Sequence, residues 1–569
     1  MKKQILLFIL FLCVLLSKNV LFHVFAFDWA MPWGAGQFWF AKLCAAVIIA
    51  SFVFIARRPW WTIVALVLID IWSMVNWLYF QSYGLFVSFS MINLAGNLNG
   101  FADAIWAYVD GRIPLFLLPT ALYILAVCFM PRQYERHGRL FCGTLVLGLA
   151  LVIGSNILLH TGRHAKGYDD GPLTFRKTLP LYVDEQKMLQ DWESAYSLVR
   201  DHSIIGYMPL HVVYEHRLKA YRQVSQDTLS AEEQTWMEQI YWPQDEAPVL
   251  TPNSHLLLIV VESLESWPLY YEGITPHINA LRHHPRSLYA DKIFSQIRYG
   301  MSADGQLIIN TGLLPIQSGV ASILYGDNKY PNFAHLYPRS SVVNPSKGTW
   351  NKSVMMPAFG YKELYEPESI AEETWWNDLD LCTKAGEWLT ASDSLSCTMV
   401  LTVSSHAPFD KVNIDVPAIT PDAPAMMRRY LSCIHYADSC IGLLLDTLEA
   451  HGRMANTTVV ITSDHIFFHG SRRRDFVPYA QEHGLPISEW NYNVPLIVYA
   501  PAIDAAGEVT GQNYQMDIFP TILHAIGCSS YAWKGLGVDL YNTEPRILSQ
   551  EEAYRLSDKL IRNNWFNLR

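Results

Sequence analysis

The stretch VVITSDHIFFHG, residues 459–470, begins with apolar and β-branched residues and then reaches Ser463, Asp464 and His465. Branched side chains are favoured in strands because they pack well on a pleated surface. The pattern predicts a buried strand over residues 457–462 that carries an acid and an imidazole at its carboxyl end. Aspartate and histidine are common metal ligands, so this strand end is a candidate site.

Three further runs of the same kind lie in the second half of the chain: HLLLIVV (255–261), CTMVLTV (397–403) and VPLIVYA (494–500). Helical stretches lie between them, such as the long amphipathic segment at residues 427–452. The alternation predicts an α/β domain with a mainly parallel sheet, because such runs fit strands that are covered on both faces. Ligands bind beyond the carboxyl ends of the strands in sheets of this type.

Polar residues follow three of these strands at the point where each one ends. Glu262 follows the first run, His406 follows the second, and Asp464 with His465 follows the third. A single histidine after a strand is more often a hydrogen-bonded residue at the rim of the sheet. Three such strand ends at one edge favour a site for a divalent ion, and these residue types suit Zn²⁺ or Mn²⁺.

A nucleophile for such a site is offered by the segment RYGMSADGQLIINTGLL, which contains Ser302. Gly300 permits a tight turn, and the apolar run that follows predicts a helix that begins near Ser302. Backbone N–H groups at a helix N-terminus favour a bound phosphate. The alternative is that Ser302 only caps the helix, as most serines at this position do.

The first 160 residues account for the apolar character of the chain, whose charged fraction is 17% against about 25% in an average soluble domain. Five apolar runs have lengths close to the ~20 residues that a bilayer requires. They cover residues 4–26, 36–56, 59–80, 113–131 and 140–159. The sequence therefore predicts a transmembrane domain of five helices over residues 1–160. Asp70 lies inside the third run, where a carboxylate either serves function or makes a buried hydrogen bond between helices, with Asn76 as one partner.

The orientation of these helices follows from the positions of lysine and arginine. The loops between runs one and two and between runs three and four contain one basic residue, Arg112. Outside the runs, the other basic residues of this region form three clusters: Lys2 and Lys3; Arg57 and Arg58; Arg132, Arg136 and Arg139. The three clusters lie on one side of the membrane if there are five spans. We therefore expect a multi-pass membrane protein with a cytoplasmic N-terminus and an extracytoplasmic region after residue 160.

The remaining chain divides into three parts by composition. Residues 161–250 are richer in charge and have helical spacing, and Ser230 with Glu233 fits a capping box, so we expect a helical linker. Residues 251–545 hold the α/β domain, and residues 546–569 are expected to form a helical tail. The net charge of −10 and the lack of a basic arm exclude nucleic acid as an expected partner.

Six motifs in order along the chain are VVESLESW, GMSADGQ, GTWNKSVM, SSHAPF, TSDH and YQMDIFPTILHAIG. With these motifs, the chain resembles the lipoteichoic acid synthases and related phosphoglycerol transferases of the sulfatase and alkaline phosphatase superfamily. The resemblance covers nearly the whole chain. It implies a sulfatase/alkaline-phosphatase-like fold for residues 251–545, placed outside the membrane behind the linker.

The resemblance also implies roles for individual residues. One divalent ion is expected, Mn²⁺ in the first place and Zn²⁺ or Mg²⁺ as alternatives, held by Glu262, Ser302, Asp464 and His465. Ser302 is the implied nucleophile, with His406 as a second catalytic residue. The implied substrate phosphate pocket contains Trp350, Lys352 and His406. Asp517, in the motif QMDIFPT, is expected to be structural.

Three positions depart from the pattern of the family. The nucleophile is usually threonine and is Ser302 here, a change that keeps the hydroxyl. The basic residue of the phosphate pocket is usually arginine and is Lys352 here, which lacks a bidentate fork. A histidine that precedes the tryptophan has no counterpart, because Val343 and Asn344 occupy that region. The Cys-x-Pro-x-Arg signature of formylglycine sulfatases is absent from the sequence, which disfavours hydrolysis of sulfate esters.

The expected function is a membrane-bound, metal-dependent transfer of a phosphoglycerol-type head group through a phosphoryl-Ser302 intermediate. The expected donor is a phospholipid, phosphatidylglycerol in the first place, and the acceptor is an extracytoplasmic glycan or lipid. One alternative is a phosphoethanolamine transferase or a phosphodiesterase of the same superfamily. Another is a non-catalytic protein that keeps the fold as a binding module, which the complete set of site residues disfavours.

Overall fold

The structure is a computed structural model of the 569-residue chain. It describes residues 1–27, 36–83, 111–165, 203–207, 229–242, 250–317, 319–344, 352–365, 378–407, 414–467, 470–488, 491–503, 507–542 and 545–567, with single residues and pairs between these ranges. The described chain forms two compact units, the first mainly from residues 1–95 and 108–225 and the second mainly from residues 226–468 and 472–569.

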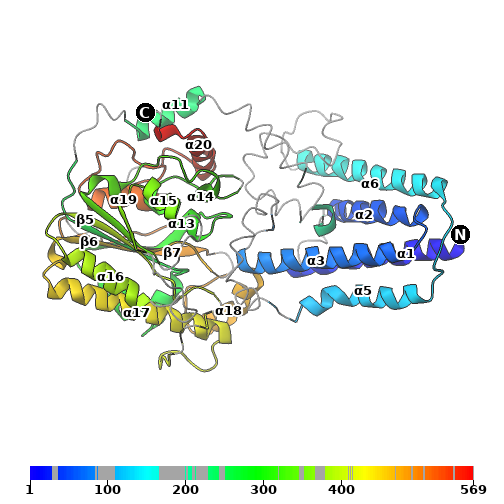
Figure 1. The fold of residues 1–569 in the computed structure, drawn as a ribbon, viewed down its shortest axis with the longest axis horizontal. Helices are drawn as coiled ribbons and strands as arrows, with labels where there is room; N and C mark the ends of the chain where they lie inside the picture. Colours follow the sequence, from blue (N-terminus) through cyan, green and yellow to red (C-terminus); the bar gives the residue numbers. More distant parts are fainter. Residues whose placement is uncertain are drawn as a thin grey trace. The chain divides into compact units, whose positions relative to one another are not determined.

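The first unit contains helices at the positions of the five predicted runs (Figure 1). They are α1 (Lys2–Phe27), α2 (Gly36–Ser51), α3 (Trp60–Tyr83), α5 (Ile113–Cys128) and α6 (Gly138–Ala165). Within the described residues, two segments are long and apolar enough to cross a membrane, Lys2–Ala26 and Trp60–Gln81. The other three helices contribute shorter apolar segments. The helices are confirmed, while the count of five membrane spans stays a prediction.

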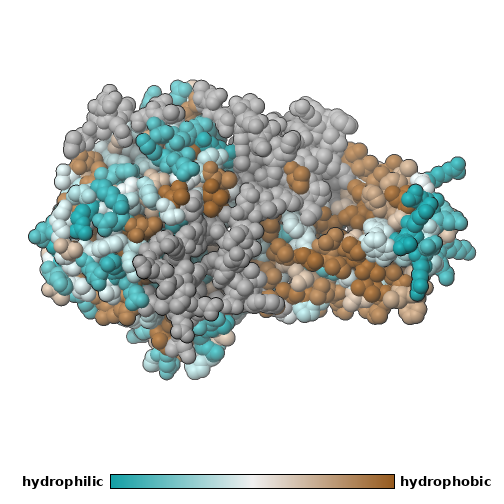
Figure 2. Space-filling model, viewed as in Figure 1, coloured by the Kyte–Doolittle hydropathy of each residue, from teal (hydrophilic) through white to brown (hydrophobic). Residues whose placement is uncertain are grey.

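Hydrogen bonds join the segments that carry the basic clusters at one end of this unit. The backbone N–H of Tyr134 donates to the carbonyl of Arg57 at 2.8 Å. The side chain of Gln4 donates to the carbonyl of Glu135 at 3.1 Å. The N-terminus and the loops around residues 57 and 134 therefore lie together, and Figure 2 shows hydrophilic residues at the end with the N-terminus and hydrophobic residues along the helices.

The carboxylate of Asp70 is buried between three helices of the first unit. It forms an ion pair with Lys18 of α1 and accepts a hydrogen bond of 2.5 Å from the hydroxyl of Thr120 on α5. The suggestion that Asn76 is its partner is wrong, because the Asn76 side chain donates to the Trp72 carbonyl of its own helix. A charge inside an apolar bundle requires a countercharge, and Lys18 supplies it.

The second unit is built on a sheet that has the strand order β4-β3-β5-β1-β6-β7-β2-β8 among the described residues, with β9 paired to β2. The strands are β1 (His255–Val261), β2 (Ser287–Phe294), β3 (Arg339–Val343), β4 (Glu363–Tyr365), β5 (Ser396–Leu401), β6 (Thr457–Ser463), β7 (Asn493–Tyr499), β8 (Gly507–Glu508) and β9 (Asn513–Tyr514). The half from β4 to β6 is parallel, as predicted. The strand β7 is antiparallel to both β6 and β2, so its carboxyl end does not join the edge where β1, β5 and β6 end.

Helices cover both faces of this sheet (Figure 1). One face carries α16 (Asp378–Thr390) and α17 (Ala425–Ala450), and the other carries α13 (Ser302–Thr311), α15 (Lys352–Ala358) and α19 (Ile518–Ala525). Both faces of the central strands are therefore covered, and β1 and β6 are buried along their whole length. The remaining helices of this unit include α12 (Pro276–Arg282), α14 (Ala321–Leu324), α18 (Gly470–Glu482) and α20 (Gln550–Arg562).

The helix α11 (Ala231–Ile240) begins with the predicted capping box of Ser230 and Glu233, which is confirmed. It packs within the second unit, although its residues fall in the range expected for the linker. Lys559 of α20 forms an ion pair with Glu233 at 2.6 Å. The backbone N–H of Trp242 donates to the carbonyl of Ala532 at 2.8 Å. The expected helical segment at residues 184–202 lies almost wholly outside the described residues.

Candidate metal centre and nucleophile

The candidate site forms where β5, β1 and β6 end side by side. Val260 of β1 pairs with Leu401 of β5, and Val261 pairs with Ser463 of β6. Glu262 and Asp464 are therefore the next residues along two neighbouring parallel strands. Parallel register brings them to the same edge, as the sequence pattern predicts.

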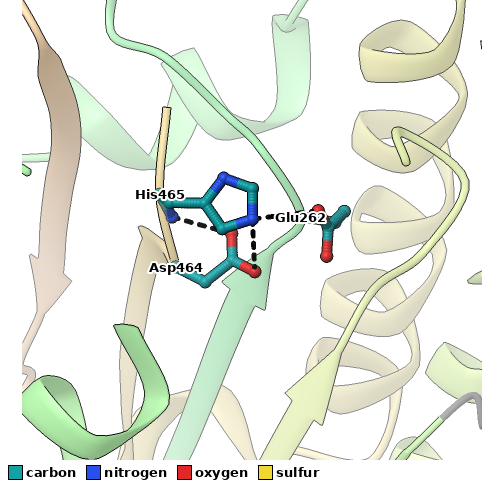
Figure 3. A group of neighbouring side chains, drawn as sticks. All are labelled: Glu262, Asp464 and His465. Atoms are coloured by element: carbon teal, nitrogen blue, oxygen red, sulfur yellow. Dashed lines mark hydrogen bonds and ion pairs between the residues drawn. The ribbon is translucent and has the colours of Figure 1, made fainter. Parts of the chain in front are cut away.

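Three buried side chains converge at this edge (Figure 3). Nε2 of His465 lies 3.3 Å from Oε1 of Glu262 and 3.5 Å from Oδ2 of Asp464. Ligand atoms of all three residues lie within 4.8 Å of one another. Two carboxylate oxygens and an imidazole nitrogen at this spacing are a donor set for a divalent transition-metal ion.

Ser302 completes the group from the first position of α13. Its Oγ atom lies 3.2 Å from Nε2 of His465 and 3.4 Å from Oε2 of Glu262. The prediction of a helix N-terminus at this residue is confirmed. Met301, and not Ser302, occupies the N-cap position, so capping does not account for the hydroxyl.

The turn before Ser302 is held in an unusual backbone conformation. Met301 has φ of 44° and ψ of −114°, a region that residues with a Cβ atom avoid. The carboxylate of Asp304 accepts the N–H groups of Arg298 at 2.8 Å and Gly300 at 2.9 Å. A Cβ atom at Gly300 would overlap this carboxylate, so the motif GMSAD requires its glycine. The turn therefore aims the hydroxyl of Ser302 at the strand edge.

The three titratable groups of the site shift one another's pKa values. Burial alone opposes ionisation of Glu262, but the hydrogen bond and charge of His465 hold the pKa of this carboxyl well below its usual range. Burial raises the pKa of Asp464 to about 6, and the charge of Glu262 adds to the rise. Burial lowers the pKa of His465, but Asp464 and Glu262 outweigh it and raise this pKa to about 9. The two carboxylates therefore stabilise a positive charge placed between them.

The orientation of the His465 ring suits a metal ligand. Its Nδ1 atom lies 2.8 Å from the carbonyl oxygen of Ile466, which accepts a hydrogen bond. This contact assigns the proton to Nδ1 in the neutral ring and leaves the lone pair of Nε2 facing Glu262 and Asp464. The residues present therefore fit a divalent ion.

The structure describes two of the three residues expected in the phosphate pocket, His406 and Lys352. His406 follows β5, and its Nδ1 atom lies 2.7 Å from the carbonyl of Ala407. Its charge is also one of the causes that lower the pKa of Glu262, after that of His465. Lys352 is buried, and its Nζ atom donates to Oδ1 of Asn344 at 3.0 Å. Trp350 lies outside the described residues.

The loop that follows Glu262 is supported by groups that the sequence analysis did not identify. Ser263 has φ of 56°, and its N–H donates to Oδ1 of Asp464 at 3.0 Å. The hydroxyl of Tyr430 donates to the carbonyl of Ser263 at 2.9 Å and accepts the N–H of Glu265 at 3.1 Å. The segment ESLES belongs to the motif VVESLESW, but no local signal connects it to a tyrosine on α17.

Comparisons with known proteins agree with this architecture. Residues 254–528 match the sulfatase family, and residues 1–168 match the lipoteichoic acid synthase N-terminal domain. The chain joins a lipoteichoic acid synthase N-terminal domain to a sulfatase domain. This pairing confirms the resemblance read from the motifs, and with it the prediction that the chain is an enzyme.

Two curated relatives span most of the chain. Lipoteichoic acid synthase 1 of Bacillus subtilis is 22% identical over 502 residues, which are 82% of this chain and 73% of the relative. Lipoteichoic acid synthase of Staphylococcus saprophyticus is 19% identical over 520 residues, which are 88% and 78% of the two chains.

A solved structure matches both units. The integral membrane protein lipooligosaccharide phosphoethanolamine transferase A of Neisseria meningitidis is 14% identical, with a TM-score of 0.52 over 92% of this chain and 96% of that one. At this identity the similarity shows a common fold.

Proposed function

We propose that this enzyme transfers a phosphoglycerol-type head group from a phospholipid to a hydroxyl group of an extracytoplasmic glycan or lipid. Phosphatidylglycerol is the proposed donor. The observation that carries the proposal is the position of Ser302, whose Oγ atom lies within 3.4 Å of Glu262 and His465 at the start of a helix. This arrangement supplies a nucleophile and a site for phosphate at one point.

Glu262, Asp464, His465 and Ser302 would hold one divalent ion, for which we propose Mn²⁺, with Zn²⁺ and Mg²⁺ as alternatives. Such an ion favours the alkoxide of Ser302 and offsets the charge of the phosphoryl oxygens. The two carboxylates supply the negative charge that the ion needs, and the Nδ1 contact of His465 orients its other nitrogen.

The proposed reaction has two displacements at phosphorus. In the first, Oγ of Ser302 attacks the phosphodiester, a bond from Oγ to phosphorus forms, and the bond to the diacylglycerol oxygen breaks. The proton of the Ser302 hydroxyl passes to the diacylglycerol oxygen, and diacylglycerol leaves. In the second, an acceptor hydroxyl loses its proton and attacks the phosphoryl-Ser302, which restores the serine hydroxyl and releases the product.

We propose that His406 handles the protons of these steps. The contact of its Nδ1 atom with the Ala407 carbonyl assigns the ring proton to Nδ1, so Nε2 carries the lone pair in the neutral ring. Such a nitrogen can accept the proton of the acceptor hydroxyl, and the protonated ring can return a proton to the leaving diacylglycerol. Lys352 and Trp350 are the proposed contacts to the substrate phosphate.

A membrane location fits a lipid donor, because the site must remain near the bilayer surface. We propose a multi-pass protein of the bacterial cytoplasmic membrane with five spans, a cytoplasmic N-terminus and an extracytoplasmic catalytic domain. The contacts of Arg57 with Tyr134 and of Gln4 with Glu135 support this arrangement, because they bring the three basic segments to one end.

A second candidate donor is phosphatidylethanolamine. The observation that raises it is the departure from the family pattern at Asn344 and Lys352, which contact each other where the pattern has a histidine and an arginine. A changed pocket can take a different head group. Purified full-length protein should therefore be exposed separately to phosphatidylglycerol and phosphatidylethanolamine.

Mass spectrometry of the peptide that contains Ser302 then identifies the transferred group. A phosphoglycerol adduct supports the main proposal, and a phosphoethanolamine adduct supports the alternative. The covalent mechanism would be overturned if wild type and a Ser302→Ala variant both released diacylglycerol and neither carried an adduct. A protein with neither turnover nor adduct would be a binding module.

A further inference from the structure

The peptide bond between Asp464 and His465 joins two of the proposed metal ligands. Because the residues are adjacent, rotation of this peptide would swing the Asp464 carboxylate and the His465 ring in different directions. The carbonyl oxygen of Asp464 belongs to this peptide. Contacts to that oxygen therefore determine how the two ligands lie relative to each other.

Gln515 contacts this oxygen from a distant segment of the chain. Its Nε2 atom donates to the carbonyl of Asp464 at 2.8 Å and to the carbonyl of Ser463 at 3.3 Å. Gln515 is fully buried, in the short 3-10 helix η8 (Gln515–Asp517). Its side-chain amide spans two consecutive peptides at the end of β6.

The other end of the Gln515 amide is fixed as well. Its Oε1 atom accepts the N–H of Gln296 at 2.8 Å and the hydroxyl of Ser295 at 3.3 Å. The side chain of Gln296 in turn accepts the N–H of Met516 at 3.0 Å. Since both ends of the amide are engaged and the pairing with Gln296 is reciprocal, the orientation of Gln515 is determined.

The helix that carries Ser302 contacts the same peptide from another side. A Cβ atom at Gly305 would overlap the carbonyl oxygen of Asp464 and lie 2.6 Å and 2.7 Å from its carbonyl carbon and Cα. These are backbone atoms, which cannot move aside cheaply. The Asp464 peptide is thus held between Gly305 of α13 and the amide of Gln515.

We propose that Gln515 is a positioning residue that fixes the Asp464–His465 peptide, and with it the geometry of the metal ligands, against the helix of the nucleophile. The inference rests on the metal site of the proposed function. It gives the motif YQMDIFPT a role at the site: Asp517 secures η8 through its ion pair with Arg546, and Gln515 reaches the metal-ligand loop from there.

The test is the affinity of full-length, detergent-purified protein for Mn²⁺ alone, compared between wild type and Gln515→Met. Methionine keeps the length and volume of the side chain but cannot donate to the two carbonyls. Loss of a group that orients metal ligands costs about 10- to 100-fold in affinity. We expect a loss in this range, together with a changed absorption spectrum of the Co²⁺-loaded protein, because that spectrum reports ligand geometry.

Two controls separate positioning from general damage to the fold. Gln512→Met makes the same substitution in an exposed side chain that donates to the carbonyl of Lys292 at 2.9 Å. Thr521→Val removes a buried hydroxyl that donates to the carbonyl of Asp517 at 2.6 Å, so it lowers the melting temperature in the same region. Both variants should keep the Mn²⁺ affinity and the Co²⁺ spectrum of wild type.

A second variant covers the case in which Gln515→Met does not fold. Gly305→Ala should also weaken Mn²⁺ binding, because the added methyl group displaces the Asp464 peptide. Its matched control is Gly386→Ala in α16, where a Cβ atom meets side-chain atoms at 3.4 Å, an ordinary contact.

The outcomes distinguish this inference from the proposed function. Equal Mn²⁺ affinity in wild type and in folded Gln515→Met and Gly305→Ala would overturn the positioning role alone. Weakened affinity in these variants, in a protein that transfers no head group, would support the role and overturn the proposed reaction. Wild-type protein that binds no Mn²⁺ would overturn both.

Discussion

The hydroxyl of Ser302 lies 3.2 Å from Nε2 of His465, although 163 residues separate the two in the chain. The contact joins the first residue of α13 to the loop after β6. Together with Glu262, Ser302 and His465 form a buried group in which a hydroxyl, a carboxylate and an imidazole meet.

Replacement of Ser302 by alanine should abolish head-group transfer while the fold survives. The variant loses the attacking oxygen, and losses of nucleophiles in covalent catalysis lower kcat by several orders of magnitude. The hydroxyl is not a helix cap, so the cost in stability is that of one hydrogen bond, about 1 kcal/mol. Release of diacylglycerol from fluorescent phosphatidylglycerol measures the activity, and circular dichroism measures the fold.

Two further variants complete this experiment. Ser302→Thr should keep measurable activity, because it retains the hydroxyl. Ser439→Ala removes a hydroxyl that donates to a carbonyl within α17 at 2.9 Å, and it should leave activity unchanged. Near wild-type turnover in a folded Ser302→Ala variant would contradict the assignment of the nucleophile.

Replacement of Asp464 by asparagine should remove most of the bound metal. Purified wild type should contain about one divalent ion per chain, and loss of a charged ligand from such a site lowers its affinity strongly. Elemental analysis measures the content. Asp438→Asn is the control, because Asp438 is also a buried carboxylate but accepts the N–H groups of His277 and Ile278 outside the site. Equal metal content in the Asp464 and Asp438 variants would refute the metal assignment.

The part of the fold that carries the site follows from the sequence because its physical cause is local. The strands β1, β5 and β6 are rich in apolar and β-branched residues, and parallel strands bring the residues after them to one edge. The position of Ser302 at a helix N-terminus follows from the glycine turn before it and the apolar helix after it. These signals are local in the sequence, so no knowledge of distant contacts is needed.

Other features depend on distant contacts and leave no local signal. The strand β2 contains Asp291 and Lys292 within its run, so its composition does not indicate a strand in the sheet. The antiparallel direction of β7 is set by its pairing with β6 and β2. Gln515 reaches Asp464 across 51 residues, and Lys18 reaches Asp70 across 52. A pattern of hydrophobicity cannot specify which polar groups will meet.

The strain at Met301 predicts that glycine is more stabilising than alanine at this position, the reverse of the usual order. Elsewhere alanine is more stabilising than glycine by roughly 0.5–1 kcal/mol. With φ of 44°, Met301 occupies a region that costs a residue with a Cβ atom about 1–3 kcal/mol. We therefore expect Met301→Gly to be more stable than Met301→Ala by about 1 kcal/mol. Both variants remove nearly the same side chain, so their difference isolates the backbone.

Chemical denaturation of the two variants measures this difference. The control is the same pair of substitutions at Met356, a buried methionine within the helix α15. There alanine should be the more stable residue. The same order at both positions would show that the conformation of Met301 stores no strain.

The buried pair of Lys18 and Asp70 yields the last prediction. Removal of one member, as in Asp70→Leu, leaves an uncompensated charge between the helices, and such single losses cost about 3–5 kcal/mol. Replacement of both, as in Lys18→Met with Asp70→Leu, should recover most of this loss, because apolar residues fill the space without a charge. Thermal unfolding in detergent, followed by the circular dichroism of the helices, measures both variants.

Activity then decides whether the pair serves only the fold of the helical unit. Thr120 also bonds to Asp70, so Thr120→Val serves as a control that removes a hydrogen bond and leaves both charges in place. If the pair is structural, the double variant should regain diacylglycerol release along with stability. A double variant that melts like wild type but releases no diacylglycerol would show that the charges act in the reaction, and a double variant as unstable as the single one would show that Lys18 and Asp70 do not compensate each other.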